Sequence, residues 1–272
     1  MIKRQMIFTV VFLVVLSASM VWGETIKMGG SGGMIKLANE LAKAYMEKNP
    51  GDVIEVSQQS LEAKGGIMGA YDGMLDIGMT ARNLEESEKG LGLKVMEIAR
   101  VGTVIGVNAS VTVDNITKTQ LCNVYEGKIK NWKGLGGADV NIMVFTRPDP
   151  DSTKVSVREG IACFASLKES SDIAIMPKYK DMNNALANNP NSIGFSDLEA
   201  IEQSNGKIKM LKLDGAGPTA DSVASGKWPM IKHFNIVQGK KQSDTAKKFI
   251  EFIRTPAGQE IIRKNSAVPL KF

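Results

Sequence analysis

The sequence contains few of the residues that build metal sites and disulfide-rich folds. Among its 272 residues there are one histidine, His233, and two cysteines, Cys122 and Cys163. This excludes a site made of several histidines, a four-cysteine zinc site and a dense disulfide framework, and we expect no cofactor. The two cysteines could form one disulfide or remain two buried thiols, because the sequence does not show how close their Cα atoms lie.

Nucleotide-binding motifs are also missing. Residues 30–35 lack the last glycine of the dinucleotide-binding fingerprint, and no Gly-Lys-Ser/Thr sequence completes a P-loop. The formal net charge is only +5 and there is no long run of lysine and arginine, so we expect no nucleic-acid partner. A mild positive charge is compatible with a small anionic ligand.

Only one long apolar run is present, and it stands at the N-terminus. Two basic residues precede the apolar residues 7–16, and the residues before Gly23 fit cleavage by signal peptidase. The alternative is a retained membrane anchor, but the run is shorter than the roughly 20 residues of a spanning helix. We therefore expect residues 1–23 to be a cleaved signal peptide and the mature protein to be soluble and exported.

The remaining chain alternates short β-like runs with helical patterns. Thr117 and Gln120 have the spacing of a capping box, and Asn49 begins a sequence that stops the preceding helical pattern. This alternation predicts an α/β fold with mainly parallel sheets. The expected strands are 26–28, 53–56, 76–79, 101–107, 141–146, 192–195, 208–213 and 234–237. The expected helices include 37–45, 117–125, 153–164, 244–254 and 256–264.

Four turns of small or polar residues precede helical patterns, at 29–33, 63–66, 80–82 and 151–153. Such turns leave backbone N–H groups free at a helix N-terminus, where the helix dipole also favours negative charge. One turn alone is weak support, because glycine-rich turns mostly serve chain geometry. Together they suggest convergence on one anion. The candidate ligand-binding residues in these turns are Ser31, Gly32, Gly33, Lys64, Gly65, Thr80, Arg82, Asp151, Ser152 and Thr153.

One pattern favours an enzyme. Residues 29–33 match the Gly-x-Ser-x-Gly pattern of a nucleophile elbow around Ser31, but a run of four glycines around a serine matches it easily. A Ser-His-Asp hydrolase would have to use His233, which stands beside a β-like run where packing histidines are common. We therefore expect no enzyme, and an exported hydrolase is the third hypothesis.

Several motifs occur in the order known from one transport family. Residues 30–33 read Gly-Ser-Gly-Gly, residues 65–67 read Gly-Gly-Ile, residues 76–82 read Asp-Ile-Gly-Met-Thr-Ala-Arg, and residues 124–132 read Val-Tyr-Glu-Gly-Lys-Ile-Lys-Asn-Trp. Residues 191–195 and 255–270 also fit. The whole mature chain resembles the periplasmic phosphate-binding proteins of ABC transporters.

The resemblance implies a two-lobed periplasmic-binding-protein fold of type II, with a ligand cleft between two mainly parallel sheets flanked by helices. Lobe 1 would comprise residues 24–107 and 234–272, and lobe 2 residues 108–233. It also implies a monomer in the periplasm that captures phosphate or a related oxyanion. An ABC permease in the inner membrane would be its partner.

The oxyanion loop departs from the family pattern Arg-x-x-Gly-Ser-Gly-Thr. Arg147 and Thr153 keep their places, whereas Pro150 and Ser152 replace glycines and Asp151 replaces a ligand-binding serine. Pro150 also removes a backbone N–H group. Ala63 and Ala81 stand where the family has polar residues, so several hydroxyl donors are lost.

Two hypotheses for Asp151 remain open. It could accept the proton of a hydrogen-phosphate ion and so repel a fully ionised anion such as sulfate, or it could cap the following helix while its charge blocks anions. Arg147 could grip an oxyanion bidentately or pair with Asp149. Arg82 has the same two options, and Lys64 could be a solvated surface lysine.

The leading hypothesis is therefore an exported solute-binding protein for an oxyanion, most simply phosphate. The alternative is a sensor or surface interaction protein on the same scaffold, whose cleft no longer binds phosphate. The changes at Ala63, Ala81 and Asp151 allow this alternative.

Overall fold

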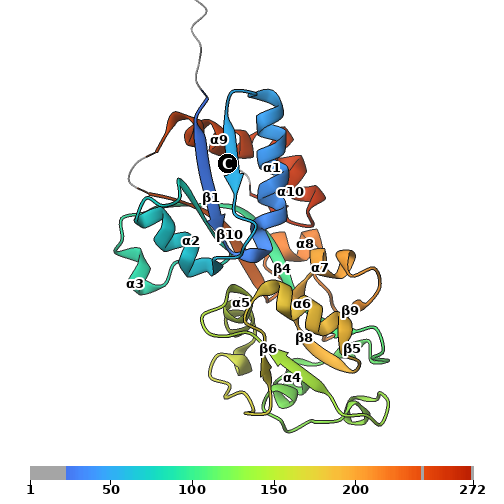
Figure 1. Cartoon of the computed structure of the whole chain (residues 1–272). Helices are drawn as coiled ribbons and strands as arrows, with labels where there is room; N and C mark the ends of the chain where they lie inside the picture. Colours follow the sequence, from blue (N-terminus) through green and yellow to red (C-terminus); the bar gives the residue numbers. More distant parts are fainter. Residues whose placement is uncertain (1–22, 240–241, 271–272) are drawn as a thin grey trace, which may run out of the picture.

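The structure is a computed structural model that describes residues 23–239 and 242–270. Almost all of the predicted signal peptide lies outside the described residues and stays a prediction. Within the described part of the chain, no helix has the length and apolar character needed to cross a membrane. Helices cover both faces of a central sheet, which confirms the predicted α/β class (Figure 1).

The sheet is mixed, and the prediction of mainly parallel sheets needs correction. Its strands follow the order β2-β1-β3-β10-β4-β8-β6-β7 in one continuous path. Neighbours on either side of the centre are parallel, but β10 runs antiparallel to β3 and β4, and β4 runs antiparallel to β8 and β9. The strands are β1 (Thr25–Gly30), β2 (Val53–Val56), β3 (Ile77–Thr80), β4 (Lys94–Asn108), β5 (Asn115–Ile116), β6 (Met143–Thr146), β7 (Ala174–Ile175), β8 (Ser192–Asp197), β9 (Ile208–Leu213), β10 (Ile231–Gln238) and β11 (Val268–Pro269).

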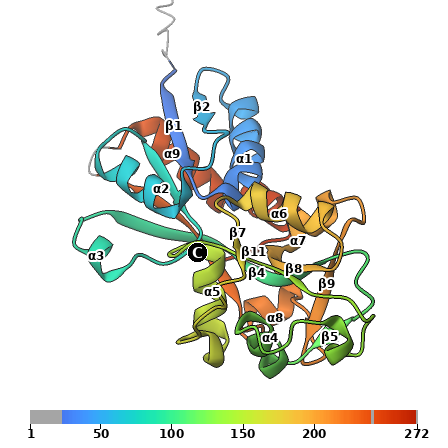
Figure 2. The same ribbon diagram turned by 60° about the horizontal axis from the view of Figure 1, so that its bottom comes forward.

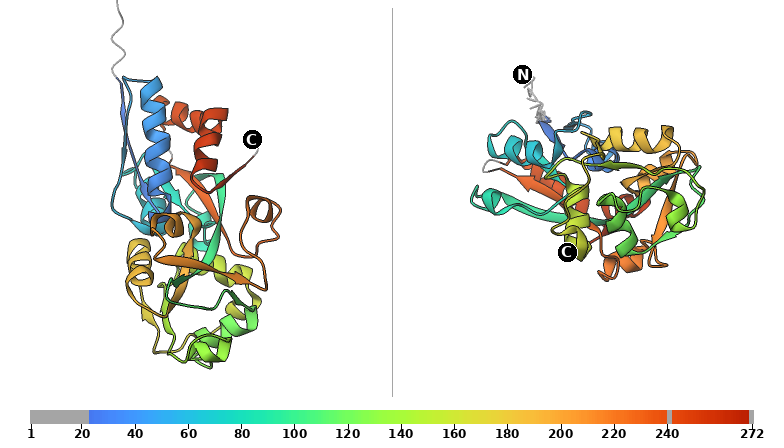
Figure 3. Two further views of the ribbon diagram at one scale, coloured as in Figure 1. Left: turned by 90° about the vertical axis from the view of Figure 1, so that its right-hand side faces the viewer. Right: turned by 90° about the horizontal axis from the view of Figure 1, so that it is seen from below.

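Strand β4 joins two halves of the molecule, which lie end to end in Figures 1 and 3. Its residues 94–102 pair with β10, and its residues 103–107 pair with β8. The sequence analysis expected only 101–107 as a strand, because Lys94, Glu97 and Arg100 interrupt the apolar pattern of the preceding residues. Each half has its own hydrophobic core. The first is built from residues 26–101 and 234–267, and the second from residues 105–230.

The helices begin and end largely where the sequence predicts. Asn49 ends α1, the Thr117–Gln120 capping box starts α4, and the last two helices have the predicted bounds. The helix after Asp151 is shorter than expected because a 3-10 turn replaces its end. The helices are α1 (Ile35–Lys48), α2 (Glu62–Tyr71), α3 (Glu86–Lys89), α4 (Lys118–Tyr125), α5 (Ser152–Gly160), α6 (Tyr179–Asn188), α7 (Leu198–Gln203), α8 (Ala220–Ala224), α9 (Asp244–Arg254) and α10 (Pro256–Lys264), with 3-10 turns η1 (Gly32–Met34), η2 (Trp132–Leu135) and η3 (Ala162–Phe164).

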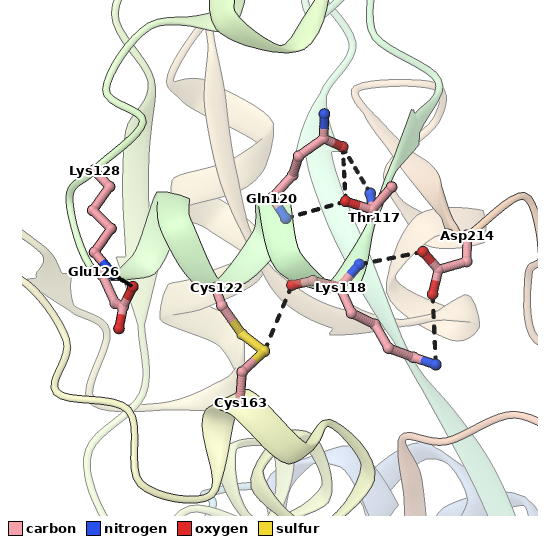
Figure 4. The surroundings of a disulfide bond; sticks show 8 residues. All are labelled: Thr117, Lys118, Gln120, Cys122, Glu126, Lys128, Cys163 and Asp214. Atoms are coloured by element: carbon pink, nitrogen blue, oxygen red, sulfur yellow. Dashed lines mark hydrogen bonds and ion pairs between the residues drawn. A yellow bond between two sulfur atoms is a disulfide. The ribbon is translucent and has the colours of Figure 1, made fainter.

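The two cysteines form a disulfide bond in the second half. Cys122 on α4 is bonded to Cys163 in η3, with Cα atoms 6.3 Å apart. Figure 4 shows the bond between the two elements, with Lys118 at the start of α4 paired with Asp214. The disulfide closes a segment that contains β6 and α5, and so ties together the part of the chain that carries Arg147 and Asp151.

We predict that replacing both cysteines by alanine lowers the free energy of unfolding. The bond joins residues 41 positions apart, and cross-links of this kind stabilise by about 2–4 kcal/mol, chiefly by restricting the unfolded chain. Urea unfolding of the oxidised protein and the C122A/C163A variant measures the difference. A reducing agent should destabilise the wild type and leave the variant unchanged. Equal midpoints for the two proteins would contradict the prediction.

Candidate functional site

A small cavity lies where the two halves meet. Helices α2 and α5 lie on the two sides of this junction (Figures 1 and 2), and the first residue of each, Glu62 and Ser152, lines the cavity. The cavity measures about 20 Å³, which suits water or a small ion rather than a large organic molecule. It is lined by Ser31, Gly32, Gly33, Glu62, Ala81, Asp151, Ser152, Thr153, Tyr179 and Lys232. Six of these residues were sequence candidates, and they come from two of the four predicted turns.

Residues at two helix starts line this cavity. Gly32 and Gly33 form the first turn of η1, and Ser152 is the first residue of α5. N–H groups at these positions have no acceptor within their own helix. Gly32 is packed tightly, since a Cβ atom there would lie 2.9 Å from the Ser60 hydroxyl oxygen. The two helix starts therefore present amide donors to the same small space.

Three hydroxyl groups add further donors. Ser31 Oγ accepts a hydrogen bond from the amide of Ala81 at 3.0 Å, which leaves its own proton to donate. Ser152 and Thr153 are buried at the start of α5 and also line the cavity. Ala81 closes the wall without a polar side chain. The lining is rich in donors of the kind that an oxyanion accepts.

Asp151 is the N-cap of α5. Its Oδ1 accepts hydrogen bonds from the amides of Thr153 at 2.9 Å and Lys154 at 3.1 Å. Its Oδ2 lies 2.8 Å from the Arg147 guanidinium. The capping contact considered from the sequence is therefore present. The carboxylate is held by three donors and still lines the cavity.

Arg147 is buried beside the cavity but does not line it. Its guanidinium donates to the carbonyl oxygen of Met176 at 2.7 Å, to Asp151 at 2.8 Å and to Glu62 at 3.2 Å. The structure therefore does not pair Arg147 with Asp149, which contacts Arg158 and Lys154 instead. The Glu62 contact crosses from the second half to the first.

Glu62 is the cavity residue whose backbone is most unusual. It has a φ of +56°, a left-handed conformation that is uncommon for a residue with a side chain. Its Oε1 accepts from the Ser60 hydroxyl at 2.9 Å, and its Oε2 contacts Arg147. Strained backbone of this kind concentrates at binding sites. The sequence analysis missed Glu62 because no turn motif marks a positive φ at a glutamate.

Lys232 and Tyr179 were also missed. Lys232 stands on β10, is 2% exposed, and donates to Asp197 Oδ2 at 2.8 Å. Tyr179 donates to the other oxygen of Asp197 at 2.6 Å. Burial alone would raise the pKa of Asp197, but Lys232 and these hydrogen bonds hold it below its usual value. Lys232 stands two residues before the predicted strand 234–237, between Ile231 and His233, and no sequence motif marks it.

Besides Arg147, four predicted site residues lie away from the cavity lining. Lys64 is exposed, and a side chain at Gly65 would meet Leu61. The Thr80 hydroxyl donates to the backbone oxygen of Arg82 at 3.1 Å. Arg82 is turned toward Glu88 and donates to both its carboxylate oxygens, at 2.7 and 2.8 Å. The predicted turns at 63–66 and 80–82 thus bring Glu62 and Ala81 to the site rather than the residues named from the sequence.

Neither a hydrolase site nor a metal site is formed around Ser31. His233 contacts Glu97 at 2.7 Å and is not part of the cavity lining. Among residues 23–239 and 242–270, no group of three or more His, Cys, Asp or Glu side chains could hold a metal ion. A catalytic pairing of Ser31 with His233 is therefore not formed in this structure.

A larger groove of about 670 Å³ runs between α1 and helices α6 and α7. It shares Gly32 and Tyr179 with the small cavity and is lined mostly by polar side chains. Glu199 lies in this groove, where burial and the nearby Asp197 raise its pKa to about 7.

We predict that Arg82 is needed for stability. Replacing it by methionine leaves the buried Glu88 uncompensated, which costs about 3–5 kcal/mol, and R82M/E88L should recover most of this loss. Burial opposes ionisation of Glu88, but the hydrogen bonds from Arg82 and the Glu85 amide lower its pKa. The contribution of this pair to the free energy of unfolding is therefore present above the unfolded-state pKa of Glu88. It is lost as the pH falls through the folded-state pKa. Urea unfolding at several pH values tests both effects, and unchanged stability of R82M would refute them.

Comparison with known proteins extends over nearly the whole chain. A family model described as a PBP superfamily domain matches residues 22–256. The phosphate-binding protein PstS of Bacillus subtilis is 28% identical over 88% of this chain and 78% of its own length. PstS of Borreliella burgdorferi is 22% identical over 96% of this chain and 98% of its own length.

Solved structures show the same similarity. A putative phosphate ABC transporter substrate-binding protein from Clostridium perfringens, with bound phosphate, is 28% identical, with a TM-score of 0.83 over 91% of this chain and 100% of that chain. An ABC-type phosphate transport receptor from Vibrio cholerae is also 28% identical, with a TM-score of 0.70 over 90% of this chain and 100% of that chain. The resemblance found in the motifs is confirmed, and the chain belongs to the PBP superfamily, where its relatives include phosphate-binding proteins.

Proposed function

We propose that this protein captures inorganic phosphate in the cavity between its halves and delivers it to an ABC importer. The observation that carries the proposal is the convergence of two helix starts, η1 and α5, on one small cavity with hydroxyl and ammonium donors around it. Relatives at 28% identity bear the names of phosphate-binding proteins, and one of them was solved with phosphate. These likenesses support the choice of phosphate among oxyanions.

Binding in such a site exchanges water for fixed donors. The amides of Gly32, Gly33 and Ser152 and the hydroxyls of Ser31 and Thr153 would hydrogen-bond the anion's oxygens. The helix starts favour negative charge through their dipoles. Because these donors are held by the fold, little reorganisation opposes binding. No bond is made or broken, so the proposed role is binding rather than catalysis.

The carboxylates beside the proposed anion position favour an anion that carries a proton. Asp151 and Glu62 both line the cavity, and an anion that carries a proton can donate it to a carboxylate oxygen. A fully ionised anion such as sulfate offers no proton and meets only repulsion there. The remaining sequence candidates Lys64, Gly65, Thr80, Arg82 and Arg147 would act by shaping the turns and the loop rather than through contact with the ligand.

We also propose how the molecule works as a carrier. The two cores would correspond to lobe 1 (24–107 and 234–272) and lobe 2 (108–233), which separate to admit the anion and close around it. The protein would be exported by cleavage near Gly23, act in the periplasm as a monomer and dock on a permease of the inner membrane. The same scaffold without anion affinity would be a sensor or interaction protein. We keep that alternative because Arg147 already donates to three protein groups, Met176, Asp151 and Glu62.

We predict that phosphate and arsenate stabilise residues 24–272 and sulfate does not. A ligand at about a hundred times its dissociation constant adds about 2.7 kcal/mol to the free energy of unfolding. Thermal unfolding should be measured after bound ligand has been removed by partial unfolding and refolding. Each anion, with molybdate and tungstate included, is compared with chloride at equal ionic strength.

Two matched variants sharpen this experiment. T153V removes a hydroxyl from the cavity and should weaken the phosphate shift, whereas T112V changes an exposed threonine and should leave the shift intact. A sulfate shift as large as the phosphate shift would refute the role of the carboxylates. No shift with any anion would refute phosphate capture and favour the alternative role.

A further inference from the structure

We propose that Lys232 is a ligand-binding residue of this site, a side-chain cation supplied by β10, the strand that pairs with β4. The inference rests on the proposed function and adds to it the residue that supplies positive charge to the anion. None of the sequence motifs includes Lys232. The argument depends on where its ammonium group lies, which of its protons are already used, and how it is held.

The ammonium group of Lys232 lies at the cavity beside the η1 turn. A Cβ atom built on Gly33 would be 3.6 Å from Lys232 Nζ, and both residues line the cavity. The side chain is 2% exposed, so its charge is shielded from bulk water. An ion pair formed at such a position is screened less by salt and water than one at the surface.

Most of the hydrogen-bonding capacity of this ammonium is unused. It has three N–H donors, and Asp197 Oδ2 is the acceptor that the structure gives it among the described residues. The rings of Tyr179 and Phe234 lie with their centroids 5.6 and 5.9 Å from Nζ. Aromatic faces attract a cation but do not replace a charged acceptor. Donors therefore remain for an anion in the cavity.

Arg147 is engaged differently. Its terminal nitrogens donate to Met176, Asp151 and Glu62, and it does not line the cavity. An anion would have to displace a carboxylate to reach it, whereas at Lys232 it meets available protons. Between Arg147 and Lys232, the geometry assigns the direct contact to Lys232.

The surroundings of Lys232 keep its position fixed. Asp197 is 1% exposed, accepts from Tyr179 and the Ala200 amide, and is not among the cavity-lining residues. Asp197 Oδ2 would lie 3.7 Å from the same Cβ position on Gly33, but Lys232 lines the cavity and Asp197 does not. Asp197 ends β8 in the second half, and Lys232 lies where β10 pairs with Val101 of β4. Lys232 would thus hold the anion at the point where both halves share strands.

The main test compares phosphate affinity in the wild type and in K232M/D197N. This double variant removes both members of the buried pair, so neither is left as an unpaired charge. Isothermal titration at fixed ionic strength should show an affinity loss of about 10- to 100-fold, the range expected for a lost hydrogen bond to a charged group. The control is K209M, which removes a lysine that pairs with Asp114 at the surface and should change affinity less than twofold.

A second measurement covers the case in which the double variant does not fold. In wild-type protein labelled with ¹⁵N at lysine side chains, the Lys232 ammonium signal should shift saturably as phosphate is added, in parallel with binding. A merely structural lysine would show no such shift. A folded double variant with affinity within twofold of wild type, or an unchanged Lys232 signal in protein that binds phosphate, overturns the inference. Wild-type protein that binds no oxyanion overturns the proposed function, and the inference falls with it.

Discussion

The pairing of β10 with β4 is the contact on which the rest of the structure depends. These antiparallel strands form the centre of the sheet, and β4 continues from the first core into the second. Both cores include residues of β4, and helix starts from the two halves, η1 and α5, line the same small cavity. The cavity is therefore a product of topology. In this sheet the shared strand β4 connects the half that carries η1 with the half that carries α5, and both elements line the cavity.

Each buried cation beside this cavity is paired with one or more carboxylates. Arg147 is balanced by Asp151 and Glu62, and Lys232 is balanced by Asp197. Burying such groups is costly, and their stability comes from partners that satisfy every carboxylate oxygen with a donor. The same arrangement fixes the directions of the donors before any ligand arrives. Unlike these groups, the Arg82–Glu88 pair stands behind the wall and supports the turn that carries Ala81.

Much of the fold could be predicted from the sequence because local signals determine it. The capping box at Thr117 and the periodic helices at the C-terminus depend on neighbours within one or two turns. The orientation of β10 and the length of β4 depend on partners more than a hundred residues away, which no local pattern shows. At the site, the turns at 31–33 and 151–153 could be predicted because their glycine, serine, threonine and aspartate residues are typical of turns and helix starts. Glu62, Tyr179 and Lys232 have ordinary residue types, and only tertiary packing brings them to the cavity.

The position of β10 in the sheet has a consequence for how the chain is made. The second core is nearly contiguous in sequence, from residue 105 to residue 230, and can assemble as soon as that segment has been synthesised. The first core needs residues 234–267, and β11 completes its pairing with β4 only at the C-terminal end. Until β10 has been synthesised, β3 and residues 94–102 of β4 each present an unpaired edge, the kind of surface on which strands of other chains can add. These edges are therefore covered only after residues 231–269, which carry β10 and β11, have been synthesised.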